Sequence, residues 1–443
     1  MIHGTLLLFA LLQQPVETTP GRPCRVTVDS IGNDFRQVVT QSGDTNYFAG
    51  GGVLAHCQGT GSSLSADSVA HYGATGRFDM IGRVEIRDTA LALDANVAAY
   101  FLRDERLEAH RNVVAVNRRN GSVLRGPNLT YYRAATGVRD TMEMYATSRP
   151  TIEYHAAADT GEPYLIVADR VRFKGDDRMW GGGRVTVDRS DLAARADSML
   201  LDEATGVVIL VGHPRVEGKE ARPYTLVGKR IELGIVEREI RLVKALGAGE
   251  ATGTDWRLTA DTIHLVVELR KLQQAFAWGD SSRPHAVSTR YTILSDSLAL
   301  DLPDEVLTQA RAFGRAFSTS KRDSAAYDTD VNWLTGDSLT ANFAQEADAN
   351  GASQARLRLL VARGSARAFT HLYDERDSVA APSLNYSRGE RIAIGLRGDR
   401  IDRVVVSGRA DGLHLEPLPP APPAPPPPAT APAAADTTKT GAP

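Results

Sequence analysis

The sequence predicts an all-β protein, built as one elongated antiparallel sheet that folds over on itself. Three observations favour this fold class. A short motif with a central aspartate recurs along the 443-residue chain, a glycine-centred motif follows its copies, and both place apolar residues at every second position. Alternation with period two is typical of strands that have one covered face and one solvated face. Apolar residues at helical spacing find no comparable support.

The aspartate motif reads apolar, any, small, Asp, any, branched apolar, any, large apolar, as in Leu258–Leu265. Its clearest copies centre on Asp67, Asp169, Asp261, Asp296 and Asp337. Degenerate copies cover residues 92–99, 124–131, 194–201, 226–233 and 387–394. In the copy at 92–99 the small and acidic residues change places, as Asp94-Ala95. A tandem repeat of this kind fixes the architecture before any single residue suggests chemistry.

The parity within this motif predicts a bent strand. The apolar residues three before and two after the aspartate would point to opposite faces of a regular strand, so they share one interior only if the strand bends or bulges between them. A small residue fits the inner side of such a bend. The aspartate is expected to accept hydrogen bonds from backbone N–H groups that the bend leaves free. We therefore interpret the repeated aspartates as structural corners rather than as catalytic carboxylates.

The second motif alternates small or apolar residues on both sides of a glycine, as from Phe78 to Ile86 around Gly82. Its glycines are Gly82, Gly183, Gly249, Gly279, Gly314, Gly364 and Gly408, with Arg111 in the place of one. Their spacing predicts units of roughly 27 to 50 residues with at least two strands each, hence about ten two-strand units up to residue 415.

Composition divides the chain into three segments. Residues 1–23 are interpreted as a leader, because the apolar run at 1–12 is too short to span a bilayer and resembles the core of a secretory signal. Residues 24–415 hold the repeats. Residues 416–443 are rich in Pro and Ala and are expected to form an extended, disordered tail. The leader predicts export.

The cysteines and the charge limit the chemistry. Cys24 and Cys57 flank the start of the repeats, where a disulfide and two unpaired buried thiols are both compatible with the sequence. Metal-site spacings such as C-x-x-C are absent, as are H-E-x-x-H and G-x-S-x-G, so we expect no metal, no cofactor and no enzymatic activity. A net charge of −3 with 24% charged residues does not describe a nucleic-acid binder.

One pair of motifs resembles a known family. Ser65–Tyr72 followed by Ile81–Ile86 is similar to the OstA/LptA-like proteins, the organic-solvent-tolerance and lipopolysaccharide-transport proteins of Gram-negative bacteria, and the similarity extends with decreasing clarity to residue 415. The resemblance implies a twisted β-jellyroll whose apolar trough carries the acyl chains of lipid A across the periplasm. It also implies end-to-end stacking of members between the two membranes.

The resemblance therefore implies a non-enzymatic carrier or bridge for lipopolysaccharide or a related lipid, in the periplasm or associated with the outer membrane. Its partners would be the lipid, other proteins of that transport system, or further copies joined at strand edges. The candidate trough lining is Val69, Val84, Ile86, Val97, Val171, Met199, Ile231, Ile263, Leu298 and Leu339. The alternative for these residues is a dry, closed core. Alternative functions are a structural β-solenoid scaffold and, least favoured, a carbohydrate-active β-helix enzyme.

Overall fold

The computed structural model describes residues 25–418 except 59–60, 136, 156–161, 220–221, 238, 255, 289, 322–330, 348–352, 374–380 and 398–399. The expected leader, Cys24 and residues 419–443 of the expected tail lie outside this part of the chain. The prediction of an all-β protein is confirmed. The described residues form one sheet of 30 strands, and the 3₁₀ turn Pro303–Glu305 is their one helical segment.

The strands of the first half are β1 (Arg25–Ile31), β2 (Asp34–Val39), β3 (Thr45–Gln58), β4 (Ser62–Tyr72), β5 (Arg77–Arg87), β6 (Leu91–Phe101), β7 (Arg106–Asn117), β8 (Val123–Tyr132), β9 (Glu143–Thr147), β10 (Thr151–Tyr154), β11 (Tyr164–Val167), β12 (Arg170–Lys174), β13 (Arg178–Asp188), β14 (Leu192–Asp202), β15 (Val207–Val211) and β16 (Arg215–Gly218). Those of the second half are β17 (Tyr224–Val227), β18 (Arg230–Val236), β19 (Glu239–Thr252), β20 (Trp256–Glu268), β21 (Lys271–Trp278), β22 (His285–Ser288), β23 (Tyr291–Leu294), β24 (Ser297–Asp301), β25 (Gln309–Lys321), β26 (Val331–Ala347), β27 (Ser353–Leu372), β28 (Ser383–Arg397), β29 (Arg400–Ser407) and β30 (Asp411–Leu415).

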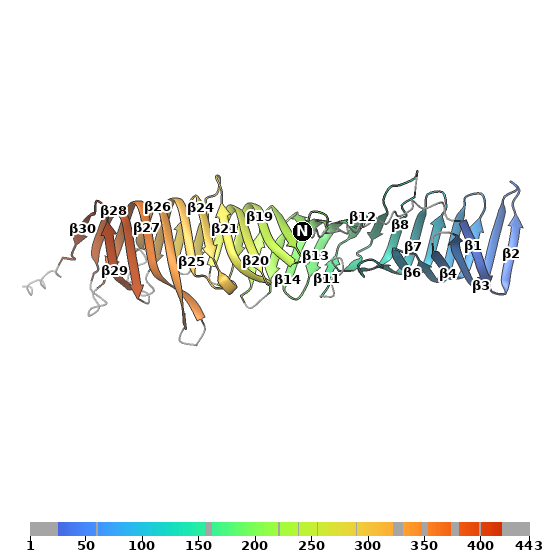
Figure 1. Ribbon diagram of the computed structural model, residues 1–443, viewed down its shortest axis with the longest axis horizontal. Helices are drawn as coiled ribbons and strands as arrows, with labels where there is room; N and C mark the ends of the chain where they lie inside the picture. Colours follow the sequence, from blue (N-terminus) through green and yellow to red (C-terminus); the bar gives the residue numbers. More distant parts are fainter. Residues whose placement is uncertain are drawn as a thin grey trace, which may run out of the picture.

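Several of these strands are halves of one long bent strand. Both β9 and β10 pair with β8, and both β15 and β16 pair with β14. The same relation joins β1 with β2, β11 with β12, β17 with β18, β21 with β22, β23 with β24, and β29 with β30. The sheet is therefore an antiparallel meander, which runs along an elongated body from β1 and β2 at one end to β29 and β30 at the other (Figure 1).

The bend is built across two strands, and Asp169 with Gly183 shows how. The Asp169 N–H donates to the Gly183 carbonyl at 2.9 Å, and the Arg184 guanidinium donates to the Asp169 carboxylate at 2.7 Å. Gly183 and Arg184 have φ of +77° and +45°, and the β13–β14 register shifts between Gly182 and Val185. A Cβ on Gly183 would lie 2.5 Å from Asp169 Oδ2. We call this arrangement the Asp–Gly corner.

The Asp–Gly corner recurs along the body. A carboxylate packs against the glycine of the next long strand at Asp67 and Gly82, Asp197 and Gly212, Asp261 and Gly279, Asp296 and Gly314, Asp337 and Gly364, and Glu390 and Gly408. In the copy that carries Lys229, the glycine at the bend is Gly247, with φ +74°, and not Gly249 as the spacing suggested. The two sequence motifs are therefore the two sides of one structural feature.

The hydrogen bonds of these aspartates differ in part from the expectation. The Asp261 carboxylate accepts from the backbone N–H groups of Ser281 and Ser282 at 2.8 and 3.0 Å. At Asp67 and Asp296, as at Asp169, the carboxylate instead accepts from the arginine that follows the glycine, Arg83 or Arg315. A residue with positive φ after the glycine brings its side chain back over the previous strand, which period-two alternation does not reveal.

The copy at 92–99 has a different register from the one inferred from sequence. The β5–β6 and β6–β7 registers shift between Asp94 or Ala95 and Val97, so Asn96 occupies the corner position and accepts a 2.7 Å hydrogen bond from Asn112. Leu93, Ala95 and Ala98 are buried. Val97 stands opposite Ile81, which is 59% exposed, and thus lies on the outer face. Its assignment to the trough lining is wrong, because the frame 92–99 puts the corner at Ala95 and the bend falls one residue later, at Asn96, which reverses the face of the residues that follow.

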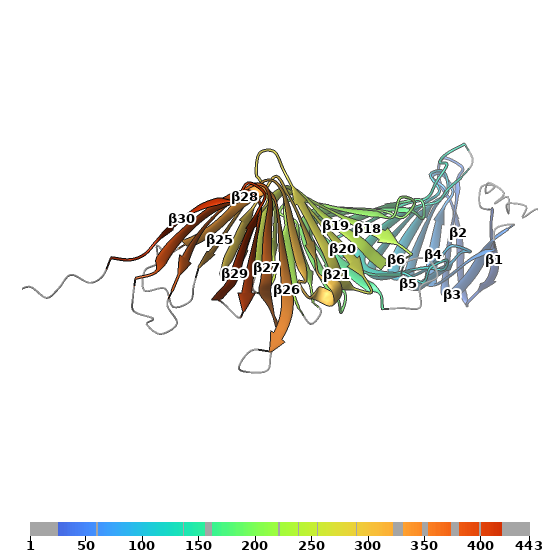
Figure 2. The ribbon, with the colours of Figure 1, turned by 60° about the vertical axis from the view of Figure 1, so that its left-hand side comes forward.

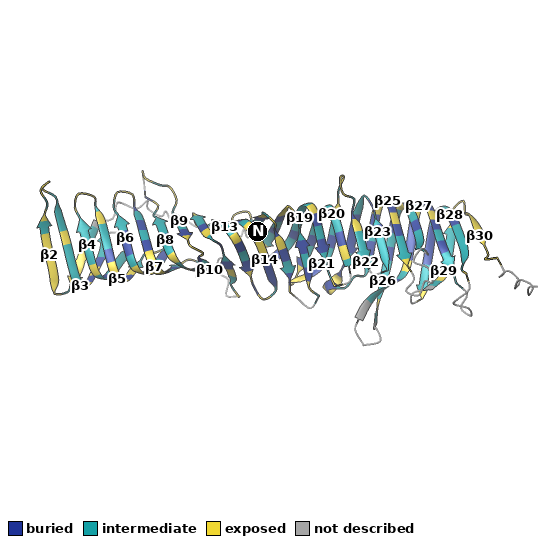
Figure 3. Cartoon of the chain, turned by 180° about the vertical axis from the view of Figure 1, so that it is seen from behind, coloured by how far each residue is buried: buried dark blue, intermediate teal, exposed yellow. Residues whose placement is uncertain are grey.

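Each bend divides its strand into two limbs that face one another. We call the half of each strand that ends at the first row of turns limb A and the other half limb B. The turns at the end of limb A form rim A, which includes residues 88–90, 118–122 and 189–191. The turns at the end of limb B form rim B, which includes residues 73–76, 102–105, 175–177 and 203–206. Figure 2 shows the strands fanning around the long axis, and Figure 3 shows buried bands alternating along them, with less burial in β2 and β3.

The second half of the interior is filled by alternation across strands. In one inward row of limb B, large and small residues stand opposite each other from β18 to β28, in the order Ile231, Ala245, Ile263, Ala277, Leu298, Ala312, Leu339, Ala362 and Ile392. None of these side chains is more than 2% exposed. Alternation of this kind lets side chains interdigitate without voids.

The corner makes a prediction about stability. Gly183→Ala places a Cβ against Asp169 at positive φ, so we expect a loss of about 1–3 kcal/mol in the free energy of unfolding. Gly181→Ala is the matched control, because its Cβ would meet Val185 and Ala168 at ordinary distances of 3.4 and 3.5 Å. Urea denaturation of both variants measures the difference, and equal midpoints would show that the corner does not need glycine.

Candidate ligand cavities

Two adjoining cavities lie between the limbs in the first half of the body. The larger has a volume of about 370 Å³ and the smaller of about 120 Å³. Asp88, Leu91, Tyr131 and Arg133 line both cavities, so the two are neighbours. Two other cavities further along the body reach only about 20 and 30 Å³. Of the space in these four cavities, most therefore lies between β1 and β14.

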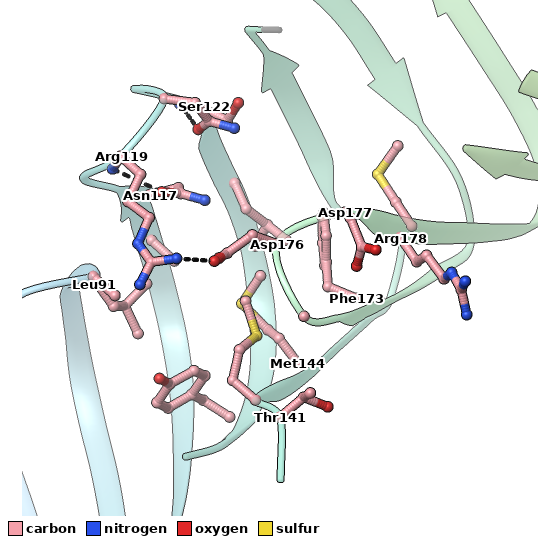
Figure 4. Close-up of a pocket in the computed structure, with 18 of the residues that line it drawn as sticks. Leu91, Asn117, Arg119, Ser122, Thr141, Met144, Phe173, Asp176, Asp177 and Arg178 are labelled. Carbon is pink, nitrogen blue, oxygen red and sulfur yellow. Dashed lines mark hydrogen bonds and ion pairs between the residues drawn. The ribbon is translucent and has the colours of Figure 1, made fainter. Parts of the chain in front are cut away.

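The larger cavity has an apolar interior and a charged rim. Its inner surface includes Leu124, Met144, Ile152, Met179 and Leu201, all buried. In Figure 4, Leu91, Met144 and Phe173 lie between the strands, whereas charged side chains lie on the turns that border the cavity. These charged residues are Asp88, Arg119, Arg133, Asp140, Asp176, Asp177, Arg178 and Glu203. An amphiphile with apolar tails and a charged head matches this division.

The smaller cavity is lined almost entirely by apolar groups from both limbs. Limb A supplies Val53, Leu64 and Ile86, and limb B supplies Val69 and Phe78. The cavity extends to β1, where Val26 and Val28 line it and Val28 is 50% exposed. The interior is therefore continuous with the surface at the β1–β2 end.

An aromatic row extends this interior to the end of limb B. Tyr47, His71 and Phe78 stand opposite one another on β3, β4 and β5, and their rings stack at 6.0 and 4.3 Å. Phe35 of β2 stacks on Tyr47 at 6.2 Å and is 57% exposed. Burial lowers the pKa of His71. Phe35 and Tyr47, at 57% and 40% exposure, form an apolar ledge at this end of the described chain.

Hydrogen-bonded tyrosines occupy the polar side of the cavities. The Tyr154 hydroxyl donates to Glu203 and the Tyr100 hydroxyl donates to the buried Glu105. Burial raises the pKa of Tyr131 to about 12. The pKa of Glu203 is also raised, chiefly by burial and further by the nearby Asp176 and Asp177, although the bond from Tyr154 opposes this.

The predicted lining residues divide into three groups. Val69 and Ile86 line the smaller cavity. Val84, Val171, Met199, Ile231, Ile263, Leu298 and Leu339 face the interior but are at most 4% exposed and belong to the packed core. Val97 lies outside. The aspartates of the five clearest motif copies line neither cavity. The closed-core alternative thus describes most of the interior, and the open space lies near one end.

Sequence reasoning missed the residues that border the larger cavity. Arg119, Asp176 and Glu203 lie in turns, where period-two alternation carries no information. Their shared feature is a charged residue in a turn between strands, a signal too common to single them out. Cys57 is disulfide-bonded. Cys24 lies outside the described residues, so the predicted pairing stays a prediction.

Within the described part of the chain, no group of three or more His, Cys, Asp or Glu side chains could hold a metal ion. No helix there has the length and apolarity to cross a membrane. Comparison of the sequence with models of known protein families finds no match, and comparison with curated proteins finds none either.

The raised pKa of Glu203 predicts a pH-dependent stability. The folded state holds the Glu203 proton more tightly than the unfolded state, so the free energy of unfolding should fall as the pH rises from 4.5, the ordinary value, through the raised pKa. Tyr154→Phe removes a bond that favours the ionised carboxylate and should steepen this fall, whereas Glu203→Gln should abolish it. Denaturation midpoints measured across this pH range test the prediction. It is contradicted if the midpoint of the native protein rises with pH more steeply than the midpoint of Glu203→Gln.

Proposed function

We propose that this protein is a non-enzymatic carrier whose two cavities bind the acyl chains of a lipid. The observation that carries the proposal is the pair of adjoining apolar cavities between the limbs, bordered by charged turns and open at the β1–β2 end. Each methylene removed from water contributes about 0.8 kcal/mol. About ten acyl carbons in these cavities would therefore contribute about 8 kcal/mol toward binding.

The border of the larger cavity holds three arginines beside five acidic side chains, and the arginines are the groups that can pair with an anionic head. Arg119, Arg133 and Arg178 lie at the edge of the larger cavity, and guanidinium groups bind phosphate and carboxylate well. Lipopolysaccharide or a related phosphorylated lipid is the ligand that best combines such a head with several acyl chains. The cavity is then a local binding site, in contrast to a lining spread evenly along the body.

The proposal extends to the architecture and location that the family resemblance implies. The recurrent Asp–Gly corner supports a β-jellyroll of the OstA/LptA type, and the apolar leader supports a periplasmic or outer-membrane-associated protein. Within the described residues, β1 and β2 pair only with β3, and β29 and β30 only with β28. These two strand edges are available to further copies or to other transport proteins.

A structural scaffold is the second candidate function. The packed interior from β18 to β28 favours it, because a filled core contributes rigidity and no ligand space. The two candidates differ in what the first half of the body does: a scaffold needs no lipid there.

Photo-crosslinking distinguishes them. Benzoylphenylalanine in place of Tyr131, which lines both cavities, should capture lipopolysaccharide in the periplasm of a Gram-negative host. The same substitution at Tyr132 is the matched control, because the next residue along β8 faces outward, where its ring meets that of Tyr145. A probe at Ile263 should capture nothing, since that side chain is fully buried. Equal capture from Tyr131 and Tyr132, or none from either together with lipid-free polymers, favours the scaffold.

A further inference from the structure

The two rims meet over the larger cavity through side chains. Arg119, in the turn between β7 and β8 on rim A, pairs with Asp176, in the turn between β12 and β13 on rim B, 57 residues later. Figure 4 shows this contact spanning the edge of the cavity. It is an ion pair between groups whose side chains are 59% and 42% exposed.

Two further contacts cross between the rims beside it. Arg133 follows β8 on rim B and lies 3.9 Å from Asp88 of rim A, with side chains only 20% and 15% exposed. Tyr154 ends β10 on limb A, and its hydroxyl bonds to Glu203 of rim B, 49 residues later. Asp88, Arg119, Arg133, Tyr154, Asp176 and Glu203 all line the larger cavity. The crossing contacts therefore form its side wall.

The backbone hydrogen bonds around the cavity join turns of the same rim. On rim A, the Arg118 N–H donates to Ala90 at 2.9 Å. On rim B, the N–H groups of Arg133 and Glu203 donate to Glu105 and Asp177 at 2.9 and 2.8 Å. Backbone hydrogen bonds thus join the turns along each rim, whereas Arg119–Asp176, Arg133–Asp88 and Tyr154–Glu203 bridge from one rim to the other. The two limbs are otherwise held together by the corners and by the apolar side chains beneath, which here enclose a cavity and not a packed core.

We propose that the pairs Arg119–Asp176, Arg133–Asp88 and Tyr154–Glu203 form a latch that closes the side of the larger cavity and opens to admit a lipid laterally. This inference rests on the proposed lipid-carrier function. Arg119–Asp176 is exposed and contributes little to stability, whereas Arg133–Asp88 and Tyr154–Glu203 are largely buried and hold the closed state. All three contacts join side chains, so the rims separate without loss of strand pairing. An anionic head group can then replace Asp176 on Arg119, which keeps that guanidinium paired while the carboxylate of Asp176, already 42% exposed, turns to water.

Crosslinking of the two rims tests the latch. Arg119→Cys and Asp176→Cys together, joined by a short bismaleimide, tie rim A to rim B while the oxidised Cys57 does not react. Uptake of N-phenyl-1-naphthylamine, which fluoresces in apolar surroundings, is followed by stopped flow. The crosslink should slow uptake by about tenfold or more, because it removes the gating motion. The control is Arg125→Cys with Glu153→Cys, a 2.6 Å pair of similar exposure on neighbouring strands of limb A.

Charge variants supply an independent measurement. Arg119→Glu faces Asp176 with a like charge and should speed uptake by about two- to fivefold, the ratio expected for the loss of a surface ion pair. Arg119→Asp combined with Asp176→Arg restores the pair and should return the rate to that of the native protein. Unchanged rates in both the crosslinked and the charge variants would overturn the latch and place access at the β1–β2 end. Absence of binding in the native protein itself would overturn the lipid-carrier function, and the latch with it.

Discussion

The contact between a carboxylate and the glycine of the next long strand is the constraint on which this fold depends. Asp169 leaves no room for a side chain on Gly183, and Gly183 reaches the backbone conformation that few other residues adopt. Because the contact lies between strands, the bend of one strand fixes the place of the bend in its neighbour. Successive bends then align into one ridge, and two limbs with a common interior follow from that alignment.

The corner also decides which side chains face inward, and it explains what could be predicted from the sequence. The apolar alternation changes parity within the aspartate motif, so the bend at Asp169 can be predicted from a single strand. The contact of Asp169 with Gly183 cannot be predicted in this way, because it depends on the register between β12 and β13. At this corner Asn96 replaces the acidic residue, so the motif at residues 92–99 falls one residue too early and assigns Val97 to the wrong face.

Whether the interior is filled is likewise a property of pairs of strands. Ile263 lies between Ala245 and Ala277 on the neighbouring strands, and all three are buried. One large side chain between two small ones fills the interior, whereas large side chains at all three positions would overfill it. In the sequence all three appear only as apolar residues that face inward, so the sequence does not show which of them are tightly packed. The charged side chains at the larger cavity were out of reach for another reason: Arg119 and Asp176 lie in turns and meet only because the limbs fold over each other.

The crossing of the limbs connects the cavities with the open end. Arg119 on rim A contacts Asp176 on rim B, 57 residues later in the chain, and Tyr154 at the end of limb A contacts Glu203 on rim B, 49 residues later. Each strand of limb A therefore lies opposite a later strand of limb B. Among the described residues, the first strands of limb B consequently extend beyond limb A, and Phe35 and Tyr47 are exposed on the face that points inward elsewhere. An apolar ledge leads from there to the smaller cavity, and the larger cavity follows behind the latch. Under the proposed function, the filled second half of the body is a rigid extension that holds this binding end at a distance.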